Sequence, residues 1–294
     1  MPTTETDHPS PGQDPSPHAG PDAGGAAGET SAFRDIICAV DGTLGSTAAV
    51  RLAASLAAPD GHLTLLAVTA VAGSGDYETA DISPSRAERL LSSDKRIAAE
   101  AGVRASAVID PRSPAAEVIL ERAAEHELLA IGPPGTWLSE MIVGGTAKTM
   151  LSRFTTPMLV VRQPYVDSLH RRQILIASDG GEGSDRLIEL GARIARSQDA
   201  RVRLVNALGS ESTTNPRAIR AQAQALARAV PDAGEPHIEP GRPWEVIAGA
   251  AAGSDAALII LASRRLAGLR ALGSVSRRAV YEAPCAVLVV PPSA

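Results

Sequence analysis

Two glycines and a Gly-Thr pair that follow an apolar run have the types and spacing to hold a phosphorylated ligand. Gly132 and Gly135 bracket two prolines in GPPG, and Gly145-Thr146 comes after nine more residues. Because glycine has no Cβ, the chain can approach a ligand closely at the first pair. Gly145-Thr146 opens a helical pattern, whose free N–H groups and positive dipole end form an anion site. The hydroxyl of Thr146 adds a further donor.

A carboxylate and two prolines refine this prediction. Asp41 closes the apolar run IICAV and could accept hydrogen bonds from a ribose or hold a hydrated Mg²⁺. Together with the Gly-Thr corner, it favours a nucleotide as the ligand. Pro133 and Pro134 have no N–H to donate, and Pro134 favours an extended conformation at Pro133. We therefore expect weak binding, with the anion held by the remaining donors: Gly135, Gly145, Thr146 and Ala147.

Alternating strand and helix patterns position these residues. Short aliphatic runs predict strands at 35–40, 62–69, 103–109, 128–132 and 158–162. Helical patterns lie between them at 45–57, 84–101, 114–126 and 145–154. This alternation predicts an α/β fold with a parallel sheet covered by helices on both faces, of a flavodoxin-like or adenine-nucleotide α-hydrolase-like strand order. In the order 3-2-1-4-5, strands 1 and 4 flank the point where the order reverses, so Asp41 and Gly132 would face one crevice.

The chain repeats this pattern once. DIICAVDGTLGS from Asp35 matches QILIASDGGEGS from Gln173, and PAAEVILERAA matches RPWEVIAGAAA through Glu117 and Glu245. Pro157 and Pro284 match near the two ends. Three matches in one order indicate two copies of one domain. We expect domains at 33–163 and 173–292, a linker at 164–172 and a disordered tail at 1–32, which is rich in Pro, Gly, Ser, Thr and Asp.

Composition and charge exclude several classes of partner. The net charge is −5 with no long basic block, so neither nucleic acid nor an anionic membrane is an expected partner. No segment approaches the roughly 18 apolar residues of a membrane helix, and the N-terminus lacks the pattern of a secretory signal. Cys38 and Cys285 lie in or beside apolar runs and are expected to be buried thiols. A cytoplasmic protein is the simplest expectation.

These residues resemble a known family. The spacing Gly132-x2-Gly135-x9-Gly145-Thr146, together with Asp41 in ICAVDGT, is similar to the motif of ATP-binding universal stress proteins. The ends PMLVV and PCAVLVV are also similar to the family's Pro-x-Leu-Val-Val terminus. The resemblance covers about 33–292, in a tandem two-domain form of the UspA type.

The resemblance implies two Rossmann-like domains with five-stranded parallel sheets of order 3-2-1-4-5. It implies that the last strands pair, so the two copies form an intrachain pseudo-dimer; a homodimer stays open. It also implies bound ATP, ADP or AMP, with Mg²⁺ as a further candidate, at the positions that match the family's motif. These are Ala39, Asp41, Val68, Gly132, Gly135, Gly145, Thr146 and Ala147, with Val68 contacting adenine through its backbone.

The second copy departs from this motif. Ala262 and Arg265 replace the two glycines, and seven rather than nine residues precede Gly273-Ser274. Arg265 either fills the pocket or supplies charge to it, and the shortened loop favours filling. Asp179 remains at the position of Asp41. We therefore expect one competent site, in the first copy.

Three functions stay open for the sequence. The favoured one is a nucleotide-binding regulator or signalling module of the stress response, without a catalytic residue or a metal centre. The others are a dimerisation scaffold that binds no nucleotide and a weak ATPase. The sequence has neither a Walker A lysine nor a pyrophosphatase loop, and its six histidines show no metal spacing. The apolar loop that carries Trp137 would be a lid over the nucleotide or a contact surface for a protein partner that the sequence does not identify.

Overall fold

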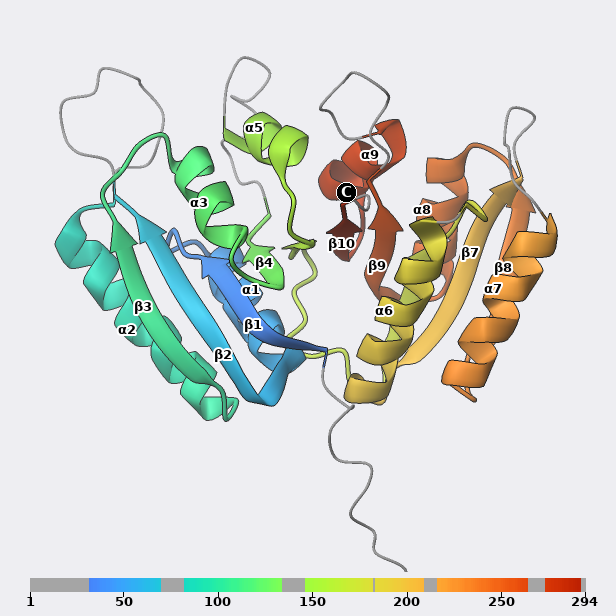
Figure 1. Ribbon diagram of the computed structural model, residues 1–294, viewed down its shortest axis with the longest axis horizontal. Coiled ribbons are helices and arrows are strands. Elements are labelled where there is room, and N and C mark those ends of the chain that lie inside the picture. The colour runs from blue at the N-terminus through green and yellow to red at the C-terminus, as the bar shows by residue number, and fades with distance from the viewer. Residues whose placement is uncertain are drawn as a thin grey trace, which may run out of the picture.

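The computed structural model describes residues 32–69, 82–133, 146–181, 183–208, 216–263 and 273–291. Its strands form one ten-stranded sheet to which each half of the chain contributes five strands. Figure 1 shows the halves side by side, with β5 and β10 between them. The tail predicted at 1–32 lies, except for Ala32, outside the described residues.

The first half alternates strands and helices as its periodicity predicts. Its elements are β1 (Phe33–Ala39), α1 (Leu44–Leu56), β2 (Ala57–Val68), α2 (Pro84–Glu100), β3 (Arg104–Asp110), α3 (Ala115–Ala123), β4 (Leu128–Ile131), α5 (Thr146–Arg153) and β5 (Met158–Val160). One boundary differs clearly from the prediction, since β2 begins at Ala57 rather than near 62. Ala57 pairs with Phe33 at the start of β1, and the register shifts before Asp35 pairs with His62.

The second half repeats the same succession. Its elements are β6 (Gln173–Ala177), α6 (Gly183–Gln198), β7 (Arg201–Leu208), α7 (Pro216–Ala229), β8 (Gly234–Pro240), α8 (Pro243–Gly253), β9 (Ala256–Ala262), α9 (Ser274–Glu282) and β10 (Ala286–Val290). The order across the sheet is β3-β2-β1-β4-β5-β10-β9-β6-β7-β8, which confirms the order 3-2-1-4-5 in each half. Neighbouring strands are parallel except β5 and β10, which pair antiparallel through Leu159 and Leu288.

Aliphatic side chains fill both faces of this sheet. Alternate residues of β1 show the division, because Ile36 packs with one buried cluster and Ile37 with the other. The first cluster includes residues of α1, α2, α6 and α7, and the second includes residues of α3, α5, α8 and α9. Strands buried on both faces need apolar side chains at every position, which explains the continuous aliphatic runs in the sequence.

Local capping explains where several helices begin. Thr43 caps α1 by accepting a hydrogen bond from the N–H of Ser46, and Ser83 caps α2 in the same way. The residue before α3 is Pro114, which makes no side-chain cap. An N-cap side chain contributes about 1 kcal/mol at such a position, so α3 depends more on its packing.

The connection between the halves is packed rather than free. Leu169 is fully buried in the first cluster, and Tyr165 and Val166 pack against it. Arg162 donates from Nε to the carbonyl of Ala283 and from Nη1 to that of Val280, at 2.9 and 2.7 Å. These carbonyls belong to the end of α9, so Arg162 ties the end of the first half to the second.

Candidate functional site

The carboxyl ends of β1 and β4 meet at the sheet edge where the strand order reverses. Cys38 of β1 pairs with Ala130 of β4, so Asp41 and Gly132 follow neighbouring strand ends. The juxtaposition predicted for these two residues is therefore present. In an open α/β sheet this is where a ligand binds.

The carboxylate of Asp41 is held in one orientation by Thr43. Its Oδ1 accepts hydrogen bonds from the backbone N–H of Thr43 at 2.8 Å and from Thr43 Oγ1 at 2.7 Å. Thr43 Oγ1 in turn accepts from the N–H of Ser46 in the first turn of α1, at 3.1 Å. Asp41 is half-buried, and its Oδ2 has no hydrogen-bond partner among the described residues. One carboxylate oxygen is thus structural, and the other is available to a ligand.

Gly132 packs against the start of α1. A Cβ at Gly132 would lie 2.7 Å from the backbone N of Ser46 and 2.8 Å from the carbonyl carbon of Gly45. A Cβ at Gly45 would in turn overlap Pro133 Cδ. These contacts require glycine at both positions whether or not a ligand binds. Pro133, which the sequence marks only as a stiff residue without a donor, is a packing residue at this corner.

Val68, the predicted adenine contact, and the predicted nucleotide-binding residue Ala39 also lie at this edge. Ala39 ends β1 and Val68 ends β2, and both are half-buried. The backbone continues the sheet for one more residue on each strand, since Val40 donates to Leu66 and Thr69 donates to Asp110. These hydrogen bonds hold the ends of β1, β2 and β3 together at this edge.

The remaining predicted contacts are only partly within the described residues. Gly135 and Gly145 lie outside them, as do Pro134 and Trp137. Thr146 and Ala147 begin α5, as the Gly-Thr pattern predicts, although their side chains are not described. The first turn of α5 has backbone N–H groups without intrahelical acceptors, the feature that suits an anion.

A buried acid beneath this edge is missed by the sequence analysis. Asp94 of α2 is only 4% exposed, and no described residue hydrogen-bonds its carboxylate. Burial raises the pKa of Asp94 to about 6; the charge of Arg51 lowers this pKa, and that of Asp41 raises it. The signal in the sequence is an aspartate on the apolar stripe of α2, between Leu91 and Ala98.

The cysteine next to this acid is a buried thiol, as predicted. Burial raises the pKa of Cys38 well above its ordinary value, and Asp94 and Asp41 raise it further. Cys285 is also buried and free. Thiolates rather than thiols react, so neither residue has the character of a nucleophile.

In the second half, hydrogen bonds occupy the corresponding edge. Asp179 Oδ1 accepts from the N–H of Gly181 at 2.8 Å and from Ser184 Oγ at 2.9 Å. Gln222 of α7 is the counterpart of Asp94, because it follows Ile219 at the spacing at which Asp94 follows Leu91. Its side-chain oxygen accepts a hydrogen bond from Ser178 Oγ at 2.6 Å. Its amide donates to Asp185 at 2.8 Å. The second half therefore has a neutral, hydrogen-bonded glutamine at a position that holds a buried acid in the first.

The two halves also differ at the loop after their fourth strand. Ala262 ends β9, and its carbonyl accepts a hydrogen bond from Ser276 of α9 at 2.9 Å. Gly183 is the counterpart of Gly45, but a Cβ there would meet nothing within 4 Å. Arg265 lies outside the described residues.

Two classes of site can be assessed for the described residues. Within them, no cluster of three or more His, Cys, Asp or Glu side chains is arranged to hold a metal ion. None of their helices has the length and hydropathy to cross a membrane.

Comparison with known proteins gives the same family for both halves of the chain. The model of the universal stress protein family matches residues 32–162 and again 170–291. A Thermus aquaticus relative, described as a universal stress protein in the QAH/OAS sulfhydrylase 3′ region, is 34% identical over 134 residues, 40% of this chain and 98% of that protein.

Solved structures share the whole tandem fold. A universal stress protein from Archaeoglobus fulgidus superposes with a TM-score of 0.74 at 18% identity, covering 90% of this chain and 98% of that one. A putative universal stress protein from Pseudomonas aeruginosa has a TM-score of 0.65 at 20% identity, covering 89% of this chain and 94% of that one. The chain belongs to the universal stress protein family and contains two of its domains in tandem.

Proposed function

We propose that the chain binds an adenine nucleotide at the carboxyl edge of its first domain and acts as a regulatory or signalling module of the stress response. The observation that carries the proposal is the carboxylate of Asp41. Thr43 fixes one of its oxygens, and the other has no partner among the residues that the structure describes, beside the reversal of strand order. A preorganised acceptor at this place suits the hydroxyl groups of a ribose.

The proposal assigns each part of the nucleotide to an element. Adenine would contact the strand ends at Ala39 and Val68, and the ribose or a hydrated Mg²⁺ would contact Asp41. The phosphates would lie at the start of α5. Gly132 limits the distance between the β4 loop and α1, and thereby positions the rest of the loop. The phosphate donors in this arrangement are Gly135, Gly145, Thr146 and Ala147.

We propose one nucleotide per chain. In the second domain Asp179 Oδ1 accepts hydrogen bonds as Asp41 Oδ1 does in the first, but the loop differs because Ala262 and Arg265 replace the motif glycines. The pairing of β5 with β10 already joins the two domains within one chain. The second domain would then serve as the pseudo-dimer partner of the first.

Binding rather than turnover is the proposed role. Hydrolysis would need a positioned base and a cation facing the leaving phosphate. The oriented carboxylate of Asp41 already directs Oδ1 to Thr43, which leaves a single oxygen for the ligand. We place this role in the cytoplasm, since Cys38 and Cys285 are buried free thiols of the kind that persists in a reducing compartment.

Calorimetric titration of the full chain with Mg-ATP tests this proposal. We expect one equivalent to bind, and Asp41→Asn to weaken binding about tenfold, the usual loss for one charged hydrogen bond. The matched control is Asp179→Asn at the corresponding position of the second domain, which should bind like the parent chain. Two equivalents, or equal losses in the two variants, would contradict a single site in the first domain.

Titration heat and phosphate release, measured on the same protein, distinguish the two alternative functions. An absence of heat at any nucleotide concentration would favour a scaffold. Phosphate release above the blank that disappears in Gly145→Arg would favour an ATPase.

A further inference from the structure

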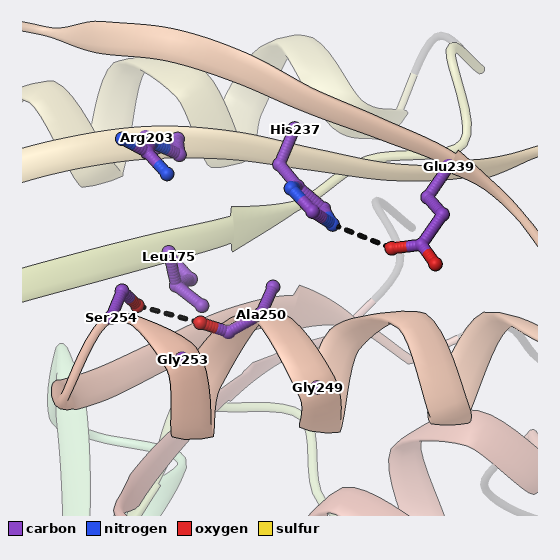
Figure 2. Close-up of a pocket in the computed structure, with 8 residues that line it drawn as sticks. All are labelled: Leu175, Arg203, His237, Glu239, Gly249, Ala250, Gly253 and Ser254. Atoms are coloured by element: carbon purple, nitrogen blue, oxygen red, sulfur yellow. Dashed lines mark hydrogen bonds and ion pairs between the residues drawn. The ribbon is translucent and has the colours of Figure 1, made fainter.

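The second domain contains a cavity that is distinct from the proposed nucleotide site. Its volume is about 400 Å³, and it lies between α8 and the strands β6, β7 and β8 (Figure 2). Neither Asp179 nor Ser178 contributes to its wall. The residues that line it are Leu175, Arg203, His237, Glu239, Gly249, Ala250, Gly253 and Ser254.

Small residues on α8 create this cavity. A Cβ added at Gly249 or at Gly253 would meet no atom within 4 Å. Ala250 adds only a methyl group, and the hydroxyl of Ser254 donates back to the carbonyl of Ala250 at 2.6 Å. The side of α8 that faces the cavity therefore has almost no side-chain volume.

The first domain has large side chains at the same place. The match of Glu117 with Glu245 aligns Arg122 with Ala250 and His126 with Ser254. Arg122 Nη2 lies 3.0 Å from Asp110 Oδ2 at the end of β3. These interactions cover the sheet in the first domain, and their loss from α8 leaves it uncovered.

The histidine that follows α3 shows the same difference. His126 Nε2 lies 3.1 Å from Thr64 Oγ1 on β2. Thr64 of β2 pairs with Ile37 of β1, and Arg203 of β7 pairs with Leu175 of β6. Because the same strands of the two domains pair in the same register, Arg203 occupies the position of Thr64. The second domain thus has small residues in place of Arg122 and His126, and it adds Arg203 on the sheet.

Arg203 supplies an uncompensated positive charge to the cavity. Its Nε is buried and has no hydrogen-bond partner, and no described residue forms an ion pair with its guanidinium. The other polar side chains of the wall contact each other rather than Arg203, because His237 Nε2 lies 3.0 Å from Glu239 Oε2 (Figure 2). A partly buried cation without a partner loses hydration and gains nothing in return. An anion in the cavity would supply the missing interaction.

We propose that this cavity binds a small organic anion whose carboxylate or phosphate group pairs with Arg203. A guanidinium is suited to either group, since its N–H donors match two oxygens at once. The body of the ligand would lie between Leu175 and the glycine face of α8, a wall that favours a flat apolar group. A volume of about 400 Å³ is within the usual range for small-molecule sites.

Nuclear magnetic resonance on the full chain tests the proposal with benzoate and phenyl phosphate as probes. We expect saturable shifts of the Arg203 Nε–H and of the backbone amides of Gly249 and Gly253. Benzamide, which has the same ring without the charge, should not saturate these signals. Tighter binding of either acid supports the proposal and identifies the head group.

Three variants separate a built site from general surface binding. Arg203→Gln should weaken the tighter acid about tenfold or more, the loss expected for a charged hydrogen bond. Ala250→Arg restores the residue of the first domain and should block the cavity. Ala252→Arg adds the same charge to the same helix at an exposed residue outside the lining, and should bind like the parent chain.

Several results would overturn the proposal. Unsaturable shifts with both acids, equal binding of benzamide, or equal effects of the two α8 variants would each do so. Thermal melting of each variant identifies loss of folding. The Mg-ATP titration should be the same in all three variants, so failure here is distinguishable from failure of the nucleotide proposal.

Discussion

Replacing Asp94 with asparagine should stabilise the protein at neutral pH and remove part of its pH dependence. Asp94 is 4% exposed among apolar side chains, and no described residue hydrogen-bonds it. Asp94→Asn keeps the shape of the side chain and removes its charge. The change therefore isolates the cost of keeping a carboxylate in this position.

The magnitude follows from the pKa. Burial raises the pKa of Asp94 from 3.8 to about 6, and each unit corresponds to about 1.4 kcal/mol. The folded state therefore binds this proton more tightly than the unfolded chain, so the free energy of unfolding decreases as the pH rises from about 4 to 6. The charged carboxylate costs about 3 kcal/mol at about pH 7.5 and about 1 kcal/mol at about pH 4.5.

Urea unfolding followed by circular dichroism measures the effect at these two pH values. The asparagine amide has its own burial cost, but that cost does not change with pH. The gain of Asp94→Asn over the parent chain should therefore be about 2 kcal/mol larger at the higher pH. Glu88→Gln on the exposed side of α2 is the control, and should change stability by less than about 0.5 kcal/mol at either pH.

Equal effects of Asp94→Asn at the two pH values would refute this reasoning, because they would mean that Asp94 titrates alike in the folded and unfolded states. A second variant checks the cause. The charge of Asp41 contributes to the raised pKa of Asp94, so Asp41→Asn should reduce the difference between the two pH values. An unchanged difference in that background would contradict the coupling.

Two further predictions concern packing. Gly132→Ala should destabilise the fold by about 1–3 kcal/mol, because its Cβ would lie 2.7 Å from the backbone N of Ser46. The control is Gly183→Ala, which should be neutral or stabilising because a Cβ there meets nothing within 4 Å. Equal melting temperatures of the two variants would contradict the packing argument. Arg162→Gln should cost about 1–3 kcal/mol, because it removes the charged donor to the carbonyl of Ala283. Calorimetric scanning should show this loss, and an unchanged transition would mean that this contact does not couple the halves.

The sequence predicted the order of the elements well. Strands buried on both faces must be aliphatic throughout, so the runs at β1 and β4 are recognisable without their partners. The repeat through Glu117 and Glu245, together with the handedness of parallel connections, leaves few possible sheets. The juxtaposition of Asp41 with Gly132 follows from that order.

Contacts between distant segments could not be predicted in this way. The glycine pattern predicts a ligand at Gly132, and the structure adds a packing reason for this glycine, because the backbone of α1 occupies the space of its Cβ. Asp94 was missed because its helical stripe reveals that the position is buried, without revealing what lies opposite. Both observations concern neighbours that are far apart in the chain.

The sequence by itself determined two copies of a parallel α/β domain and the aspartate that follows the first strand of each copy, and its family resemblance supplied the strand order. Only the tertiary structure decided that a carboxylate oxygen of Asp41 has no partner among the described residues, that Asp94 is buried, and that Arg203 lines a cavity beside α8. Periodicity records which side of an element is buried, because burial repeats with the helix or strand. The partner of a buried group is set by the packing of separate elements, and it has no period in the sequence.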